Sequence, residues 1–288
     1  MDFAAVVVIE VVYAVASLAL ISAGLAVVFG MMRVINLAHG EFLMLGGYAA
    51  IVATKAGLNI YVAMLVVSPL VVGVIGLVVE RLVIRFLYGR MLDTMLATWG
   101  LSLLLTGAVT MIFGNTTTGI STPIPGFKLG NYQVGGYNIF IICVAAALMA
   151  AIYVVLRATR LGLVARGAMQ SADMAAALGH DPSRIYMTTF AIGAAISGLA
   201  GGVLAPLTGL TPTTGALYVA KAFITVISGG AAIVTGTLSS AALFGPISQL
   251  TTLATTPVWG DVALLLAAVV LLRLLPQGIT GRLFTRQL

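Results

Sequence analysis

Residues 185–220 read IYMTTFAIGAAISGLAGGVLAPLTGLTPTTGALYVA and contain no Asp, Glu, Lys or Arg. Four further stretches are free of charged residues in the same way: 56–79, 94–127, 129–156 and 222–260. A membrane-spanning helix needs about 20 consecutive, mainly apolar residues. These stretches are long and apolar on all sides, whereas the strands of a membrane barrel would show short alternating segments. They therefore predict helices that cross a lipid bilayer.

Composition supports the same conclusion for all 288 residues. Charged residues make up 8% of the chain and hydrophobic residues 61%, and the mean hydropathy is +1.15. A soluble domain carries about 25% charged residues, so this chain could not cover its surface with polar groups in water. The net charge of +6 comes from too few residues to form a nucleic-acid groove, and we expect no nucleic-acid partner. The single cysteine, Cys143, is expected to be a buried apolar residue.

We predict an all-α, polytopic membrane protein with about eight to nine transmembrane or re-entrant helices. The first apolar segment is longer than the core of a signal peptide, so we treat it as a retained helix. The whole chain, 1–288, is expected to form one transmembrane domain. The apolar segments cover roughly 3–30, 40–56, 60–82, 94–113, 136–156, 185–206, 219–235, 237–255 and 261–275.

The arginines predict an orientation, because cytoplasmic loops of membrane proteins carry an excess of Arg and Lys. Most basic residues fall in 81–90, in 157–184 and in a tail that holds Arg273, Arg282 and Arg286. The loop 114–136 between the first two regions has only Lys128. We therefore place the basic regions in the cytoplasm and this loop outside, which puts the N-terminus outside and the C-terminus in the cytoplasm.

The stretch GMMRVINLAHGEFLMLGGY at 30–48 brings polar side chains between two apolar runs. Such groups are costly at membrane depth and usually face a cavity or pair with one another. A broken helix beside a transport pathway would explain both the polar residues and the nearby glycines. We predict that Asn36, His39, Glu41 and Phe42 lie at the pathway or its cytoplasmic gate. The alternative is an ordinary cytoplasmic turn, in which Arg33 and Glu41 only brace helix ends.

The stretch RATRLGLVARGAMQSADMAAALGHDPSR at 157–184 is too long for a simple turn. Its Ala- and Met-rich part, 164–178, favours a helix, and Gly179 is suited to end it. Asp181 and Pro182 are typical of the first positions of the next helix. We predict a short cytoplasmic helix that docks onto a soluble partner. An amphipathic helix that only contacts lipid is the alternative.

Small residues recur every fourth position in the next predicted span, at Gly193, Ser197 and Gly201 and again at Gly198 and Gly202. This spacing predicts close helix packing. Lys221 and Asp261 are read as lone charges near the outer ends of their helices, where they extend toward the membrane surface.

No motif of an enzyme is present in the sequence. None of the lysines follows a glycine, so there is no Walker A loop for ATP, and there is no G-x-G of a dinucleotide site. We predict a protein that is not an enzyme and binds no cofactor or metal. Energy for transport would come from a partner ATPase, or, in a self-sufficient transporter or channel, from intramembrane acids such as Glu10, Glu41 and Glu80.

The stretch GLAVVFGMMRVINLAHGEFLMLGGYAA at 24–50 resembles the N-terminal signature of LivH-type permeases of branched-chain amino acid ABC importers, whose relatives include urea and short-amide permeases. Asp173, Ala175 and Gly179 have the spacing of the "EAA…G" coupling loop of ABC permeases, and LPQGITG at 275–281 resembles the family's closing motif. The resemblance implies an ABC importer permease fold with a coupling helix at 162–180. It also implies that Arg166, Asp173, Ala175 and Gly179 contact an ATPase.

The resemblance further implies the partners and the location. A paralogous LivM-type permease subunit, two cytoplasmic ABC ATPase subunits that use ATP and Mg, and a periplasmic or lipid-anchored solute-binding protein would complete the importer in a bacterial inner membrane. Branched-chain amino acids are the substrate that the family suggests. The family's usual V-L-G-G-x-G-S-x-x-G run here reads VISGGAAIVTG at 226–236, so a urea or amide substrate stays an alternative.

Overall fold

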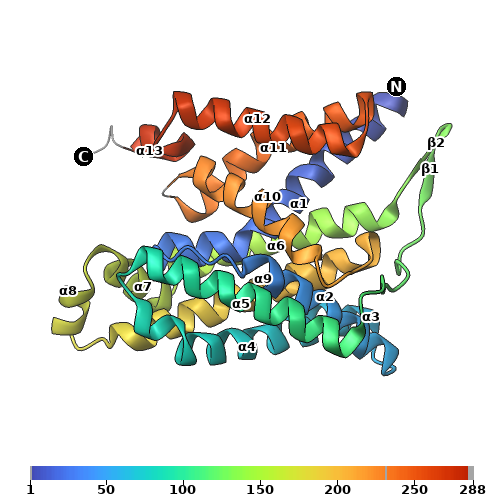
Figure 1. The fold of residues 1–288 in the computed structure, drawn as a ribbon. Helices are drawn as coiled ribbons and strands as arrows, with labels where there is room; N and C mark the ends of the chain where they lie inside the picture. Colours follow the sequence, from blue (N-terminus) through green and yellow to red (C-terminus); the bar gives the residue numbers. More distant parts are fainter. Residues whose placement is uncertain (1, 231, 285–288) are drawn as a thin grey trace. The chain divides into compact units, whose positions relative to one another are not determined.

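The computed structural model describes residues 2–230 and 232–284, and these residues are mostly helical (Figure 1). A short antiparallel hairpin, which was not predicted from the sequence, lies in the loop 114–135. Arg286 of the predicted basic tail lies outside the described residues. The helices are α1 (Asp2–Met32), α2 (His39–Lys55), α3 (Ile60–Val62), η1 (Ala63–Val67), α4 (Ser68–Leu82), η2 (Ile84–Leu87), α5 (Met91–Phe113), α6 (Gly136–Ala158), α7 (Arg160–Gln170), α8 (Ala172–Ala177), α9 (Pro182–Thr208), α10 (Thr214–Gly229), α11 (Ile233–Ala254), α12 (Pro257–Leu274) and α13 (Gly278–Phe284); the strands are β1 (Phe127–Leu129) and β2 (Tyr132–Val134).

The prediction of an all-α membrane protein is confirmed. Six helical runs of the described chain are long and apolar enough to cross a membrane: Asp2–Met32, Ile60–Leu82, Met91–Phe113, Gly136–Ala158, Pro182–Thr208 and Pro257–Gly281. Helices α10 and α11 form a further candidate as a pair bent by 112°. The apolar helix α2, with 17 residues, adds one more segment. Together these helices match the nine apolar segments of the sequence, so the estimate of eight to nine spanning or re-entrant helices holds.

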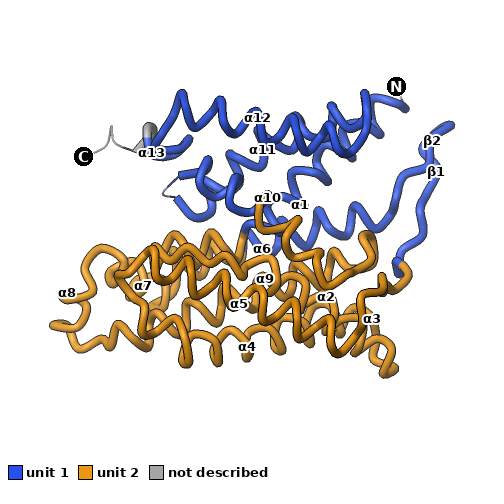
Figure 2. The backbone as a smooth tube through the Cα atoms, viewed as in Figure 1, with its two compact units in different colours: residues 1–22, 122–150, 221–288 blue, residues 23–121, 151–220 orange. Residues whose placement is uncertain are grey.

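The chain forms two compact units, each assembled from distant parts of the sequence (Figure 2). Unit 1 comprises residues 1–22, 122–150 and 221–288. Unit 2 comprises residues 23–121 and 151–220. Helix α1 therefore contributes its first turns to unit 1 and its last turns to unit 2, and α6 is divided between the units in the same way.

Unit 2 is built around α9, the most buried of the spanning helices in the described chain. Its small residues allow close approach, because a Cβ on Gly201 would lie 1.8 Å from the Leu43 carbonyl oxygen of α2. A Cβ on Gly198 would lie 2.7 Å from the Ser68 carbonyl oxygen of α4. The prediction that these residues mediate helix packing is confirmed.

Unit 1 contains the sharp bend between α10 and α11. Gly229 and Gly236 approach so closely at this bend that a Cβ on Gly229 would lie 2.5 Å from the Gly236 backbone. The Thr280 hydroxyl of α13 donates to the Gly229 carbonyl oxygen at 2.6 Å and lies 3.4 Å from the Ala232 nitrogen. A single hydroxyl thus satisfies backbone groups on both sides of the bend.

Two further expectations were wrong. Cys143 on α6 is exposed and not buried, which suits a residue that faces lipid. Lys221 and Asp261 are not lone charges, because they form an ion pair of 2.7 Å between α10 and α12. Their partner could not be recognised locally, since the two residues belong to different helices.

Candidate functional site

Polar residues gather where α1 stops and α2 begins, at the break 33–38. Helix α1 ends at Met32, and Arg33 adopts the left-handed backbone conformation with φ 51°. A residue other than glycine is uncommon in this region. The buried Asn36 then folds a tight turn, because its Oδ1 accepts from the Ala38 N–H at 3.0 Å. The helix is therefore interrupted at 33–38, as both interpretations of the sequence predict, and Asn36 shapes the turn.

A threonine of α5 holds the break in place. The Thr98 hydroxyl accepts from the Leu37 N–H at 3.1 Å and lies 3.4 Å from the Ile35 carbonyl oxygen. It also donates to the Thr94 carbonyl oxygen of its own helix at 2.8 Å. Thr98 is fully buried. It supplies polar partners to backbone groups that the end of a helix leaves unsatisfied.

His39 and Glu41 contact two different helices from the first turn of α2. The His39 Nδ1 lies 3.3 Å from the Ser197 hydroxyl of α9. Since this hydroxyl donates to the Gly193 carbonyl oxygen at 2.8 Å, the arrangement favours a His39 tautomer that donates from Nδ1. Glu41 lies beside Ser102 of α5, and its Oε2 has no hydrogen-bond partner among the described residues.

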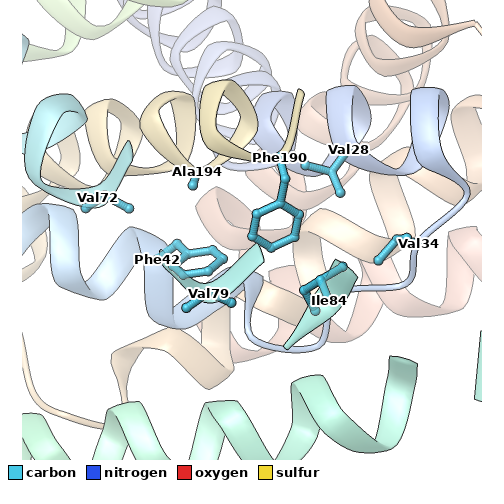
Figure 3. Close-up of a cluster of buried hydrophobic side chains, with 8 residues drawn as sticks. All are labelled: Val28, Val34, Phe42, Val72, Val79, Ile84, Phe190 and Ala194. Carbon is cyan, nitrogen blue, oxygen red and sulfur yellow. The ribbon is translucent and has the colours of Figure 1, made fainter. Parts of the chain in front are cut away.

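Phe42 joins this segment to the apolar core of unit 2. Its ring meets Phe190 of α9 edge-on, with the ring centroids 6.0 Å apart and the planes at 83°. Figure 3 shows the two rings together with Val34 of the break and Ile84 of η2, which belong to the same apolar cluster. The four predicted residues Asn36, His39, Glu41 and Phe42 are all buried, with at most 3% of each residue exposed. The four residues lie on one segment of the chain but have different neighbours: His39 and Phe42 contact α9, Glu41 lies beside α5, and Asn36 bonds within the break.

The predicted cytoplasmic segment forms two helices, α7 and α8, and the prediction of one continuous helix across 164–178 was wrong. Ser171 interrupts it in an extended conformation, and its hydroxyl accepts from the Met174 N–H at 3.2 Å as the N-cap of α8. A serine side chain competes in this way for backbone donors, so it favours caps over helix interiors.

Both predicted ends of the segment are confirmed. Gly179 has φ 85°, its N–H donates to the Ala176 carbonyl oxygen at 2.9 Å, and the His180 N–H donates to the Ala175 carbonyl oxygen at 3.0 Å. This is a Schellman ending. Asp181 then caps α9 by accepting from the Ser183 N–H at 2.9 Å. Short connections thus tie α8 directly to α9.

The segment presents apolar side chains outward. Leu161, Leu163, Met174 and Leu178 are each exposed by more than 60%. Of the predicted contact residues, Arg166, Asp173 and Gly179 are exposed, whereas Ala175 is buried. Large apolar residues exposed on a short segment are typical of an interaction surface.

An aromatic contact links the start of α9 to the loop after α4. The rings of Tyr186 and Tyr88 are 5.0 Å apart, and the Tyr88 hydroxyl donates to the carboxylate of the buried Glu80. Burial, and then the neighbouring Glu80 carboxylate, raise the pKa of the Tyr88 phenol above its usual value. Tyr88 belongs to the basic loop 81–90, which also holds Arg81 and Arg85.

The family model for the permease component of branched-chain amino acid transport systems matches residues 7–275. The chain belongs to this family. Similar proteins include the permease protein LivH of Salmonella typhimurium, 28% identical over 92% of this chain and 91% of the relative. BraD of Pseudomonas aeruginosa is 29% identical over 92% and 91% of the two chains. A probable LivH of Methanocaldococcus jannaschii is 26% identical over 92% and 88%. No solved structure matches the chain.

Two residues of this permease that shape the helix breaks were not singled out from the sequence: Thr98 bridges the break before α2, and Thr280 bridges the bend before α11. Ser197 was predicted only as a packing residue, and its contact with His39 was missed. Thr98 carried no signal, because a threonine within a helix is common. Thr280 lies inside the closing motif LPQGITG, so the motif itself marks the place where this hydroxyl is used.

Proposed function

We propose that this permease forms the translocation pathway of an ABC importer for branched-chain amino acids. The observation that carries the proposal is the direct connection from the exposed α7–α8 segment, through the Gly179 ending, into α9. Helix α9 in turn packs against the broken segment through Ser197 and Phe190. A movement imposed on the exposed segment would therefore reach the polar break.

The partners follow from this arrangement and from the family. Two cytoplasmic ATPase subunits would bind the exposed apolar face of α7 and α8 and use ATP and Mg, since the chain has no Walker A loop. A LivM-type permease subunit would complete the membrane core, and a periplasmic or lipid-anchored binding protein would deliver the substrate. This division leaves the permease itself without catalysis.

The orientation is part of the proposal. Within unit 2 the break, the loop after α4 and the start of α9 lie at one end, because Val34 and Ile84 belong to one apolar cluster and the Tyr88 ring contacts the Tyr186 ring. That end carries the basic loops 81–90 and 157–184. The excess of arginine supports a cytoplasmic location for it, with the N-terminus outside and the C-terminus inside a bacterial cell membrane.

In the mechanism we propose, the buried break is a closed cytoplasmic gate. Binding of ATP would draw the ATPases together, and the α7–α8 segment would tilt α9. The Phe190–Phe42 and Ser197–His39 contacts would then displace α2 relative to α5. The polar groups of Asn36, His39 and Glu41 would become accessible to a passing amino acid, which needs hydrogen-bond partners while it leaves water.

The decisive experiment is reconstitution. We expect the permease, copurified with its two ATPase subunits and its permease paralogue, to take up leucine into proteoliposomes only with the binding protein outside and ATP inside. Leucine uptake by the permease alone, with no ATPase present, would instead indicate a self-sufficient transporter or channel. Uptake of urea in place of leucine would support the urea or amide substrate. That alternative stays open because the run at 226–236 differs from the family's usual sequence.

Substitution at the break tests the gate. We expect Asn36→Ala and His39→Ala each to reduce ATP-driven uptake about fivefold, since each removes a hydrogen bond of about 1 kcal/mol. The measurement is the initial rate of leucine uptake at equal amounts of assembled complex. Thr188→Ala, whose exposed hydroxyl bonds only to the start of its own helix, is the matched control and should transport normally. Normal uptake in both break variants would remove the gate assignment.

Substitution at the end of α8 tests the coupling segment. No atom lies within 4 Å of the place where a Cβ at Gly179 would be, but the positive φ of this residue disfavours the side chain of Gly179→Val. We expect the ending to distort at a local cost of about 1–2 kcal/mol, with ATP hydrolysis retained and uptake strongly reduced. Gly57→Val, where φ is also positive and the surroundings are also open, lies outside the α7–α8 segment and serves as the matched control, with uptake expected at the wild-type level. If Gly179→Val assembled and transported like the wild type, α7–α8 would not be the coupling element.

A further inference from the structure

An ion pair in unit 1 stands out from its apolar surroundings. The Lys221 Nζ of α10 lies 2.7 Å from the Asp261 Oδ1 of α12. Lys221 is the only charged residue in the sequence between 185 and 260. The side chains remain 33% and 49% exposed, so both charges are paired and still open to an incoming solute.

Helices α10 and α12, which carry this ion pair, are also held in place by other contacts. Helix α12 packs on α11 at Gly260, where a Cβ would lie 2.7 Å from the Ser248 carbonyl oxygen. The far end of α10 is fixed by the Thr280 hydroxyl, which donates to Gly229.

Because both side chains are partly exposed, this ion pair is expected to add little to stability, as exposed ion pairs generally do. Ionisable groups within membrane segments are rare and usually functional. A structural brace at this place would need no charge, and the pair requires another explanation.

We propose that Lys221 and Asp261 form a binding subsite for the two charged ends of a zwitterionic α-amino acid. The inference rests on the proposed function and narrows it. The Lys221 ammonium, which has three N–H donors, receives the carboxylate of the substrate, and the Asp261 carboxylate receives its ammonium group. The substrate carboxylate takes the place of Asp261 beside Lys221, and the substrate ammonium takes the place of Lys221 beside Asp261. All four charges are therefore paired in the bound state.

This exchange suits a pathway. Binding is weak because an existing ion pair is given up, and a site along a pathway must release what it binds. The subsite also discriminates between substrates. Urea or a neutral amide carries no pair of opposite charges, and it would have to separate Lys221 from Asp261 with no compensation. The pair therefore favours an amino acid over the amide alternative.

The test uses the complete importer in proteoliposomes, with leucine as the probe. In the double variant Lys221→Met with Asp261→Asn we expect leucine uptake to fall at least tenfold, while ATP hydrolysis and detergent melting stay close to wild type. The control is Arg90→Gln with Asp93→Asn, which removes an exposed ion pair of 3.9 Å and should leave uptake unchanged. A double variant that transports leucine at the wild-type rate overturns the subsite.

A charge-swapped variant, Lys221→Asp with Asp261→Lys, distinguishes the subsite from a brace. It restores two opposite charges but reverses their order, so we expect uptake to stay at least tenfold low. Full uptake and normal melting in the swapped variant, with low melting in the uncharged one, would identify a brace and overturn the proposal. If the wild-type importer carries no leucine at all, both the proposed function and the subsite are wrong. If the wild-type importer carries leucine and the variants carry it equally well, only the subsite is wrong.

Discussion

Replacing Gly201 with alanine should destabilise the permease by about 3 kcal/mol or more, although alanine is the better helix former by about 1 kcal/mol. The reason is contact between backbones. A Cβ at Gly201 would lie 1.8 Å from the Leu43 carbonyl oxygen and 2.5 Å from the Leu43 carbonyl carbon. Neither atom can turn away as a flexible side chain could, so α2 and α9 would have to separate.

The measurement is thermal unfolding of the detergent-solubilised complex, with the yield of assembled complex as a second readout. Gly107→Ala in α5 is the matched control, because the space around that glycine is open. It should unfold at the wild-type temperature or slightly above it. Equal melting of the Gly201 and Gly107 variants would show that α2 and α9 do not pack as closely as described.

The same separation would also affect transport. The contact at Gly201 lies along the helix from Ser197 and Phe190, which touch His39 and Phe42. Any Gly201→Ala complex that assembles should therefore hydrolyse ATP with little uptake, because α9 would no longer move α2.

Much of this architecture could be predicted from the sequence, because it depends on local properties. Runs without charge locate the helices, and the spacing of Gly193, Ser197 and Gly201 indicates the packing face of α9. The ending at Gly179 and the cap at Asp181 were also recognised, since a positive φ and an N-cap each favour a few residue types. The break before α2 followed from polar residues between apolar runs.

Other features depend on partners that are distant in sequence, and these were missed. The residue Thr98 bonds to Leu37 across 61 positions, and nothing near Thr98 indicates the break that it bridges. Lys221 and Asp261 each resembled an isolated charge, because the ion pair appears only when α10 and α12 are brought together. The break at Ser171 is local but was outweighed by the alanines around it, whose helix propensity pointed to one continuous helix.

Replacing Thr98 with valine should cost about 1–3 kcal/mol of stability and most of the uptake. Valine has nearly the same shape as threonine, so the packing of α5 is kept and only the hydroxyl is lost. Hydrogen bonds between membrane helices contribute about 0.6 kcal/mol on average, but the partners of Thr98 are backbone groups in the break. The Leu37 N–H would be left buried without an acceptor, and such a group costs more than an average side-chain bond.

Two comparisons separate loss of the hydroxyl from loss of shape. Thr98→Ser keeps the hydroxyl and should recover most of the uptake. Thr110→Val, on the same helix, removes a hydroxyl that donates only to the Thr106 carbonyl oxygen at 2.8 Å, and it should behave as the wild type. Equal uptake by the valine and serine variants at position 98 would mean that this hydroxyl does not hold the break.

Thr280 extends the argument to unit 1. Like the Thr98 hydroxyl, the Thr280 hydroxyl lies between a backbone carbonyl oxygen and a backbone N–H at a place where the helical hydrogen bonds are interrupted. Irregular backbone inside a membrane protein is tolerated only where its polar groups are satisfied. Thr280→Val should therefore weaken uptake as Thr98→Val does, with Thr280→Ser again as the recovering variant. A threonine at each interruption would then satisfy the backbone groups that the break before α2 and the bend before α11 leave without helical partners, so that no unpaired group faces lipid.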